Sequence, residues 1–213
     1  MAVPTGFLRR FDLPSRLIHW SLAIPFLLPM MLQVGFGKEA VESGMITFAS
    51  SAGALVMKPV TQRALRMFGF RDTLIWNGLI SGFFLAICAA FRPTWPAAAI
   101  YAVLLIGGFM RSLQFTAYNT LAYGDVPRPR MSSATSLYTA GQQLAATIGV
   151  SAGAVSLQIA SVFSGHQVPE PFDFSVAFVV VGALTALAAP IAVLMPKTAG
   201  DELTGRAPAK AAE

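Results

Sequence analysis

Three polar residues interrupt the end of a long apolar segment. Arg111, Gln114 and Asn119 follow WPAAAIYAVLLIGGFM, a stretch without any charged residue. A charge within hydrocarbon is costly, so such residues usually face other helices or a water-filled cavity. Arg111 and Gln114 are three positions apart and share one helix face. The pattern indicates a cavity-lining or gating role. Two simpler interpretations stay open: Arg111 extends its side chain to the inner membrane surface, or the residues only join helices.

A second polar pair lies in SSATSLYTAGQQLAATIGVSAGAVSLQ, residues 132–158. Gln142 and Gln143 are about 100° apart on a helix, so at least one should face other helices or a cavity. A hydrogen bond between helices is the simpler interpretation. Small residues recur here at every fourth position, which favours close packing of two helices. This small-residue stripe consists of Gly141, Ala145, Gly149 and Gly153.

The segment KPVTQRALRMFGFRD, residues 58–72, is rich in basic residues. We expect a cytoplasmic loop here, with a short amphipathic helix that has Arg63 and Arg66 on one face and ends at Gly69. The simplest role for Lys58, Arg63, Arg66 and Arg71 is to orient the chain in a membrane.

The sequence offers little for catalysis or metal binding. The single cysteine excludes an internal disulfide and a multi-cysteine metal site. His19 and His166 are expected at different depths and cannot ligate one haem or metal together. FDLPSRLIHW, residues 11–20, resembles the first helix of four-helix b-type membrane cytochromes, but those proteins need further histidines within the membrane. All ten acidic residues fall in expected loops or tails. We therefore expect no enzyme activity, metal or cofactor.

The elements that carry these residues are expected to be membrane helices. Of the 213 residues, 55% are hydrophobic and 12% are charged, about half the charged fraction of a soluble domain. Apolar runs of this length predict an all-α membrane protein. Six spans are expected at 17–36, 43–61, 74–91, 96–123, 132–163 and 174–195. They form a bundle over 17–195, between a cytoplasmic segment, 1–16, and a disordered cytoplasmic tail, 196–213.

The basic residues are distributed unevenly between the two predicted sides of the membrane. Twelve of the fifteen lysines and arginines fall on the side of both termini, and only Lys38 and Arg92 fall on the other. Positive charge accumulates on cytoplasmic loops, so both termini are expected to be cytoplasmic. The net charge of +5 is explained in this way, and we expect no nucleic-acid partner.

Several segments resemble the C-terminal half of major facilitator superfamily transporters of the EmrB/QacA-type multidrug efflux branch. The resemblance covers about residues 20–195. It is carried by IPFLLPMMLQVGFG, SGMITFASSAGALVMKPVTQRALRMFGFR, RSLQFTAYNTLAYGDVP and MSSATSLYTAGQQLAATIGVSAGA. It implies that the six spans form one of two bundles, with substrate held between the bundles near the midplane.

The resemblance also implies roles for particular residues. Arg111 and Gln114 would line or gate the central cavity, with Asn119 nearer the cytoplasmic end. Gly53 and Lys58 match the superfamily's cytoplasmic signature Gly-x-x-x-acid-base, but Met57 stands at the acidic position.

The partners implied are the lipid bilayer, an unknown small-molecule substrate, and either a second copy of the chain or a separate N-terminal half. The family members are proton-coupled antiporters of the cell's inner (plasma) membrane. The N-terminal half is missing from this sequence, and residues 1–20 do not resemble the usual entry into the first helix. A non-transporting remnant or interaction subunit is therefore the main alternative, and a b-type cytochrome is a distant third.

Overall fold

The computed structural model describes residues 24–124, 126–196 and 198–205. Every regular element within these ranges is a helix, and five are long and apolar enough to cross a membrane. The predicted all-α membrane fold class is therefore confirmed. The five helices are α3 (Ala40–Phe68), α4 (Phe70–Ile87), α5 (Ala97–Gly124), α6 (Met131–Ser164) and α7 (Pro171–Ala188).

The first expected span is described only in part. Helix α2 (Ile24–Met30) continues into a single wider turn, η2 (Met31–Gly35). The preceding Pro29 lies inside the helix and has no backbone N–H to donate. Residues 17–23 of the expected span lie outside the described residues, as does the expected N-terminal segment 1–16.

Residues 58–72 are helical apart from Gly69, so the expected loop is wrong, but the predicted helix that carries Arg63 and Arg66 and ends at Gly69 is confirmed. Helix α3 is 29 residues long and continues past Pro59. It ends at Gly69, whose φ is 76°. The segment after Pro59 consists mostly of good helix formers, which explains why the helix does not stop there. The 29 residues span about 43 Å, which exceeds a hydrocarbon core of about 30 Å. The basic end of α3 can therefore reach beyond the hydrocarbon.

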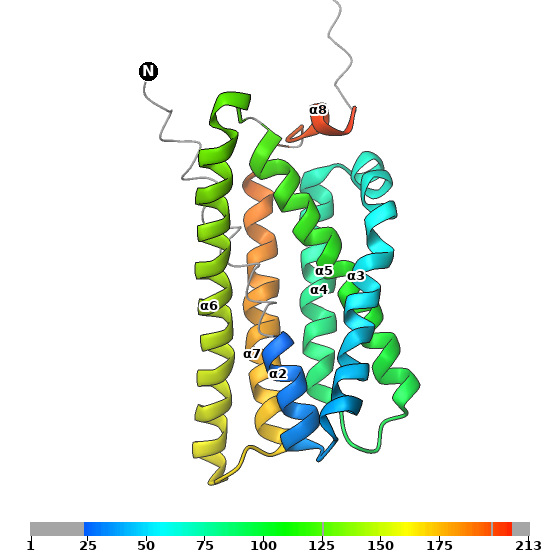
Figure 1. The fold of residues 1–213 in the computed structure, drawn as a ribbon, viewed down its shortest axis with the longest axis vertical. Helices are drawn as coiled ribbons and strands as arrows, with labels where there is room; N and C mark the ends of the chain where they lie inside the picture. The colour runs from blue at the N-terminus through cyan, green and yellow to red at the C-terminus, as the bar shows by residue number, and fades with distance from the viewer. Residues whose placement is uncertain (1–23, 125, 197, 206–213) are drawn as a thin grey trace, which may run out of the picture.

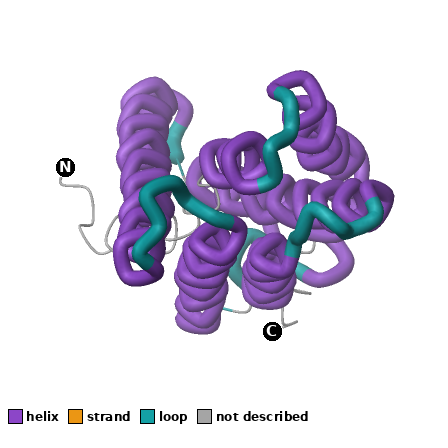
Figure 2. Tube along the Cα trace, turned by 90° about the horizontal axis from the view of Figure 1, so that it is seen from below, coloured by secondary structure: helices purple, strands orange, loops and turns teal. Residues whose placement is uncertain are grey.

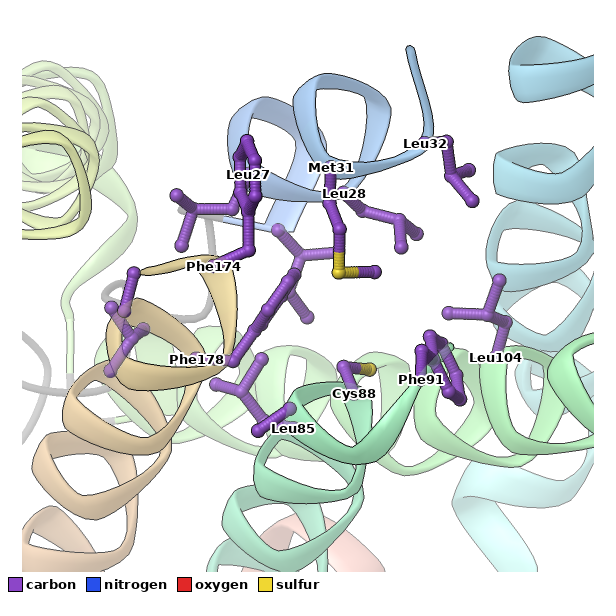
Figure 3. Packing of buried hydrophobic residues seen from close by; sticks show 14 of the residues in the cluster. Leu27, Leu28, Met31, Leu32, Leu85, Cys88, Phe91, Leu104, Phe174 and Phe178 are labelled. Atoms are coloured by element: carbon purple, nitrogen blue, oxygen red, sulfur yellow. The ribbon is translucent and has the colours of Figure 1, made fainter. Parts of the chain in front are cut away.

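Helix α6 lies at one edge of the bundle, on the side away from α3 (Figure 1). Helix α5 packs against α3 and α4, and α7 packs against α4 and α6. Figure 2 shows the bundle from the end where α6 connects to α7. Near this end α2 lies over the other helices, and its apolar side chains meet those of α4, α5 and α7 (Figure 3). The labelled part of this cluster consists of Leu27, Leu28, Met31, Leu32, Leu85, Cys88, Phe91, Leu104, Phe174 and Phe178.

Glycines allow α3 and α5 to touch backbone to backbone. A Cβ placed on Gly53 would lie 2.8 Å from the carbonyl carbon of Leu105, and one on Gly108 would lie 2.7 Å from that of Ser50. In lipid, close van der Waals packing of this kind replaces the hydrophobic effect as the force that joins helices. The sequence analysis did not identify this contact.

The small-residue stripe of α6 is buried at three of its four positions. Ala145, Gly149 and Gly153 are buried, and α6 packs against α7. Gly141 differs, because a Cβ added there would meet nothing within 4 Å. The predicted close packing therefore does not extend to Gly141, which lies in the half of α6 nearer the α5–α6 connection.

The expected disordered tail is folded in part. Residues Asp201–Thr204 form the short helix α8, which lies at the end of the bundle opposite the α6–α7 connection (Figure 1). Leu203 reaches Gly124 at the end of α5, with its Cγ 3.4 Å from the position of an added Cβ. This apolar contact explains why the segment folds back. Residues 206–213 lie outside the described residues.

The two ends of α3 provide a test of the predicted orientation. A cysteine at Lys38, just before α3, should react with an impermeant maleimide added outside intact cells, and one at Arg66 should react only after lysis. The excess of basic residues on the Arg66 side gives this direction. The parent chain is the control, because its only cysteine, Cys88, is buried. The reverse pattern would refute cytoplasmic termini.

Candidate functional site within the helical bundle

Arg111 lines a small cavity between α3, α4 and α5. Its Nη2 donates a hydrogen bond to the Ser50 hydroxyl on α3. The space within it is about 10 Å³, room for about one water molecule. Ser50, Ser81 and Arg111 give it a polar side, and the remaining lining residues are Ile24, Phe84, Leu85, Cys88, Val103, Leu104, Gly107 and Gly108. The structure therefore places Arg111 beside a cavity, although this cavity lies within the bundle.

The charge of Arg111 has no acidic partner in the part of the chain that the structure describes. The three ion pairs found there join Lys38 to Glu42, and His166 to Glu170 and Asp173. A guanidinium has five N–H donors. The Ser50 hydroxyl takes one of these donors, and the others are available to a water-sized acceptor in the cavity.

Gln114 does not line this cavity, and its contacts fit the alternative in which it joins helices. It is 3% exposed and lies between α4 and α5. Asn77 Nδ2 donates to Gln114 Oε1 at 2.8 Å and to the Met110 carbonyl at 2.8 Å. Gln114 Nε2 donates to the Leu74 carbonyl at 3.0 Å. The physical reason is that α5 is flanked on two sides, so residues three apart can reach different neighbouring helices.

Asn119 and Gln142 join α5 to α6, and Gln143 points elsewhere. Gln142 Nε2 donates to Asn119 Oδ1 at 3.2 Å, and both residues are partly buried. Near this bond, Tyr123 and Tyr138 stack edge to face with ring centroids 5.4 Å apart. Gln143 is exposed. The expectation that at least one of the two glutamines faces another helix is therefore confirmed.

Gln143 belongs to a line of exposed polar residues that the sequence analysis missed. With 3.6 residues per turn, positions spaced by four and seven fall on one face of a helix. Five such positions on α6 are polar and exposed, and we call them the polar face of α6. They are Ser136, Gln143, Thr147, Ser151 and Gln158. The spacing is visible in the sequence, but only the structure shows that this face is uncovered.

The residues that resemble the cytoplasmic signature all lie on α3. Gly53 is the contact point of α3 with α5, Met57 is fully buried, and Lys58 is exposed. Arg71, in the first turn of α4, donates to the Val193 carbonyl at 3.1 Å. With a buried methionine at the acidic position, the signature has no acid–base pair to form.

Five acidic residues lie in the first turns of helices, which corrects the expectation that all ten lie in loops or tails; they are Glu42, Asp72, Asp173, Asp201 and Glu202. Asp173 occupies the first turn of α7 and is fully buried. Helix α7 starts at Pro171, three residues before the predicted span, because proline suits the first position of a helix. Among the described residues, no group of three or more His, Cys, Asp or Glu side chains could hold a metal ion.

The fold and these polar groups define a multi-pass helical membrane protein. Residues 16–212 match the family model of the Major Facilitator Superfamily, so the chain belongs to this superfamily. The bundle described above is accordingly a half-bundle of the superfamily fold, as the resemblance implied.

Curated relatives agree with this assignment. The chain is 30% identical over 152 residues to proteins named "Putative multidrug resistance protein MdtD" from Serratia proteamaculans and from Yersinia enterocolitica. It is 29% identical over 138 residues to the protein of the same name from Pectobacterium atrosepticum. The first two alignments cover 68% of this chain and 30% of each relative. The chain therefore matches only about a third of their length. No solved structure gives a significant match.

Proposed function

We propose that this chain is one half of a small-molecule efflux transporter and that it works beside a second half-bundle. The second bundle is either another copy of this chain or a separate N-terminal half, in the inner membrane. Drug-like substrates fit the names of the relatives, and proton coupling follows from the family resemblance.

The observation that carries this proposal is the polar face of α6. Glutamine side chains in hydrocarbon cost on the order of 2–7 kcal/mol each when they have no hydrogen-bond partner. Gln143 and Gln158 are exposed on a helix of membrane-spanning length. The flanking exposed positions on α6, Leu144 and Ile148, are apolar and suit lipid. A polar face beside an apolar face indicates that water, substrate or another bundle covers the polar one.

Arg111 supplies the charged group of the proposed transport path. It is positioned near the middle of α5 and held by Ser50 across the close α3–α5 contact. Since no described acidic residue pairs with it, Arg111 favours substrates, or groups of the second bundle, that carry negative charge or strong acceptors. Within the described ranges, the hydrogen bond to Ser50 holds the guanidinium and leaves its other donors available.

Disulfide crosslinking between chains tests the second bundle. We expect a cysteine at Gln143 to form crosslinked dimers in membranes if two copies pair through the polar face of α6. The matched control is a cysteine at Leu144, the next residue on the same helix, which should stay uncrosslinked. Equal crosslinking at both positions would indicate random collision, and none at either position in a lone chain would exclude the homodimer.

Replacement of Arg111 tests the transport path. In cells lacking other drug efflux pumps, Arg111→Leu should lower efflux of a lipophilic fluorescent drug by about tenfold or more, equivalent to about 1.4 kcal/mol. Membrane insertion should be unchanged or better, because a costly charge is removed.

The control is Arg130→Leu, which removes an exposed arginine of the short η4 helix (Arg128–Arg130) and should leave efflux unchanged. Efflux that survives Arg111→Leu would contradict this role. If the parent chain itself gives no efflux in these cells, the non-transporting alternative is favoured.

A further inference from the structure

His166, Asp173 and Glu170 form a compact ionisable cluster where α6 connects to α7. Helix α6 ends at Gly165, which has φ 74°. The next residue, His166, donates its backbone N–H to the Ser161 carbonyl at 2.9 Å, as in a helix-terminating turn of the Schellman type. This turn fixes the imidazole at the end of α6, beside the start of α7.

The start of α7 holds the carboxylate that receives the imidazole. Asp173 accepts hydrogen bonds at Oδ2 from the Glu170 backbone N–H at 2.9 Å and from the Ser161 hydroxyl at 3.1 Å. A side chain in the first turn that reaches back to the preceding backbone N–H stabilises a helix start. Asp173 is therefore tied to α6, to the connection and to its own helix. Its Oδ1 is buried and has no partner among the described residues.

The imidazole of His166 lies between two carboxylates. Its Nδ1 is 2.8 Å from Asp173 Oδ2, and its Nε2 is 3.5 Å from Glu170 Oε2. Neutral imidazole donates from one ring nitrogen only, whereas imidazolium donates from both. In the neutral form, one ring nitrogen would present a lone pair to a carboxylate. The geometry therefore suits the protonated ring, because both flanking oxygens are acceptors.

Among the described residues, the other charged groups at this end of the bundle make no ion pair with the cluster. Arg92, after α4, donates to the Ala89 and Phe91 carbonyls and to the Ser175 hydroxyl. Lys38 is paired with Glu42. Glu39 precedes α3. In the parts of the chain with described positions, no ion pair links any of these four groups to His166 or Asp173.

We propose that His166, Asp173 and Glu170 bind a proton and thereby clamp the α6–α7 connection. With the proton bound, the imidazolium holds the end of α6 against the start of α7. When the proton leaves, the Nε2 contact with Glu170 is lost, and the two carboxylates carry uncompensated negative charge. This clamp needs neither substrate nor a second bundle. Its test is therefore independent of the transporter proposal.

The direction of the pH dependence follows from the hydrogen bond to Asp173, which raises the pKa of His166 above its ordinary value of 6.5. A raised pKa in the folded state means that folding favours the protonated ring. The stabilisation is complete below the unfolded value, near 6.5, and is lost as pH rises through the folded pKa. The clamp should therefore be closed in acid and weaker in mild alkali.

Histidine-selective NMR of the full chain in detergent micelles tests the proposal. The chain has two histidines, so His19→Gln leaves one ring signal to follow. We expect His166 to titrate above 6.5, and its midpoint should fall in Asp173→Asn and, by less, in Glu170→Gln. Glu170→Gln keeps the experiment decisive if Asp173→Asn fails to fold, because the Glu170 side chain is largely exposed. Glu39→Gln, at the same end of the bundle, is the control and should leave the midpoint unchanged.

A second measurement shows whether the proton acts as a clamp. Hydrogen exchange of backbone amides over residues 161–174, corrected for the intrinsic pH dependence, should be slower at pH 6 than at pH 9. This difference should vanish in His166→Gln and persist in His19→Gln. A midpoint at or below 6.5, or one unaffected by both carboxylate variants, would overturn the proton site. A pH-independent exchange rate would overturn the clamp.

Discussion

Gly53→Ala is expected to separate α3 from α5 and to destabilise the bundle strongly. The added Cβ would lie 2.8 Å from the Leu105 carbonyl carbon and 3.0 Å from the Phe109 backbone nitrogen. These are backbone atoms, so no side-chain rotation can make room, and one helix must move. Overpacking of this kind costs about 1–3 kcal/mol and sometimes more. The cost should appear as a lower midpoint of thermal unfolding in detergent.

Gly44→Ala is the matched control, because Gly44 lies on the same helix and a Cβ there meets nothing within 4 Å. Alanine is the better helix former by up to about 1 kcal/mol, so this variant should be as stable as the parent or slightly more stable. Equal stability of the Gly53 and Gly44 variants would show that α3 and α5 are not in backbone contact.

Helix type and five of the six expected spans could be predicted from the sequence, because membrane-length apolar runs leave few alternatives. The runs containing Arg111 and Gln142 were placed correctly, since hydropathy extends over whole helices. The end of α3 was missed because the basic residues of 58–72 suggested a loop, although good helix formers continue the helix to Phe68. The start of α7 was missed because Asp173 suggested a loop. In both cases a local signal competed with a longer helix.

The candidate site was less predictable, because the sequence shows which residues share a helix face but not what covers that face. Arg111 and Gln114 share a face by spacing, yet one reaches α3 and the other α4. Gln142 and Gln143 are adjacent, and only Gln142 finds a partner in Asn119. These outcomes depend on which helices lie next to each other. The spacing of residues along one helix does not reveal this.

The α4–α5 amide pair explains why Gln114 is better understood as a structural residue than as a gating one. Asn77 and Gln114 are 4% and 3% exposed, so neither can reach substrate without a rearrangement of the bundle. Between them they make three hydrogen bonds across the helix interface. Measured values for such bonds in membranes average about 0.6 kcal/mol and reach about 1.7. An amide left without a partner costs about 1–3 kcal/mol, so the loss of one partner outweighs the value of the bond.

These magnitudes predict the outcome of a double-mutant cycle at Asn77 and Gln114. Each of Asn77→Leu and Gln114→Leu should destabilise the bundle by about 1–3 kcal/mol, because each leaves a buried amide without its partner. The double variant leaves no amide unpaired, so its cost should be smaller than the sum by about 0.5–3 kcal/mol. Reversible unfolding in mixed micelles measures all three. Additive costs would mean that the pair is not coupled, and Gln114 would then regain its place as a candidate for the transport path.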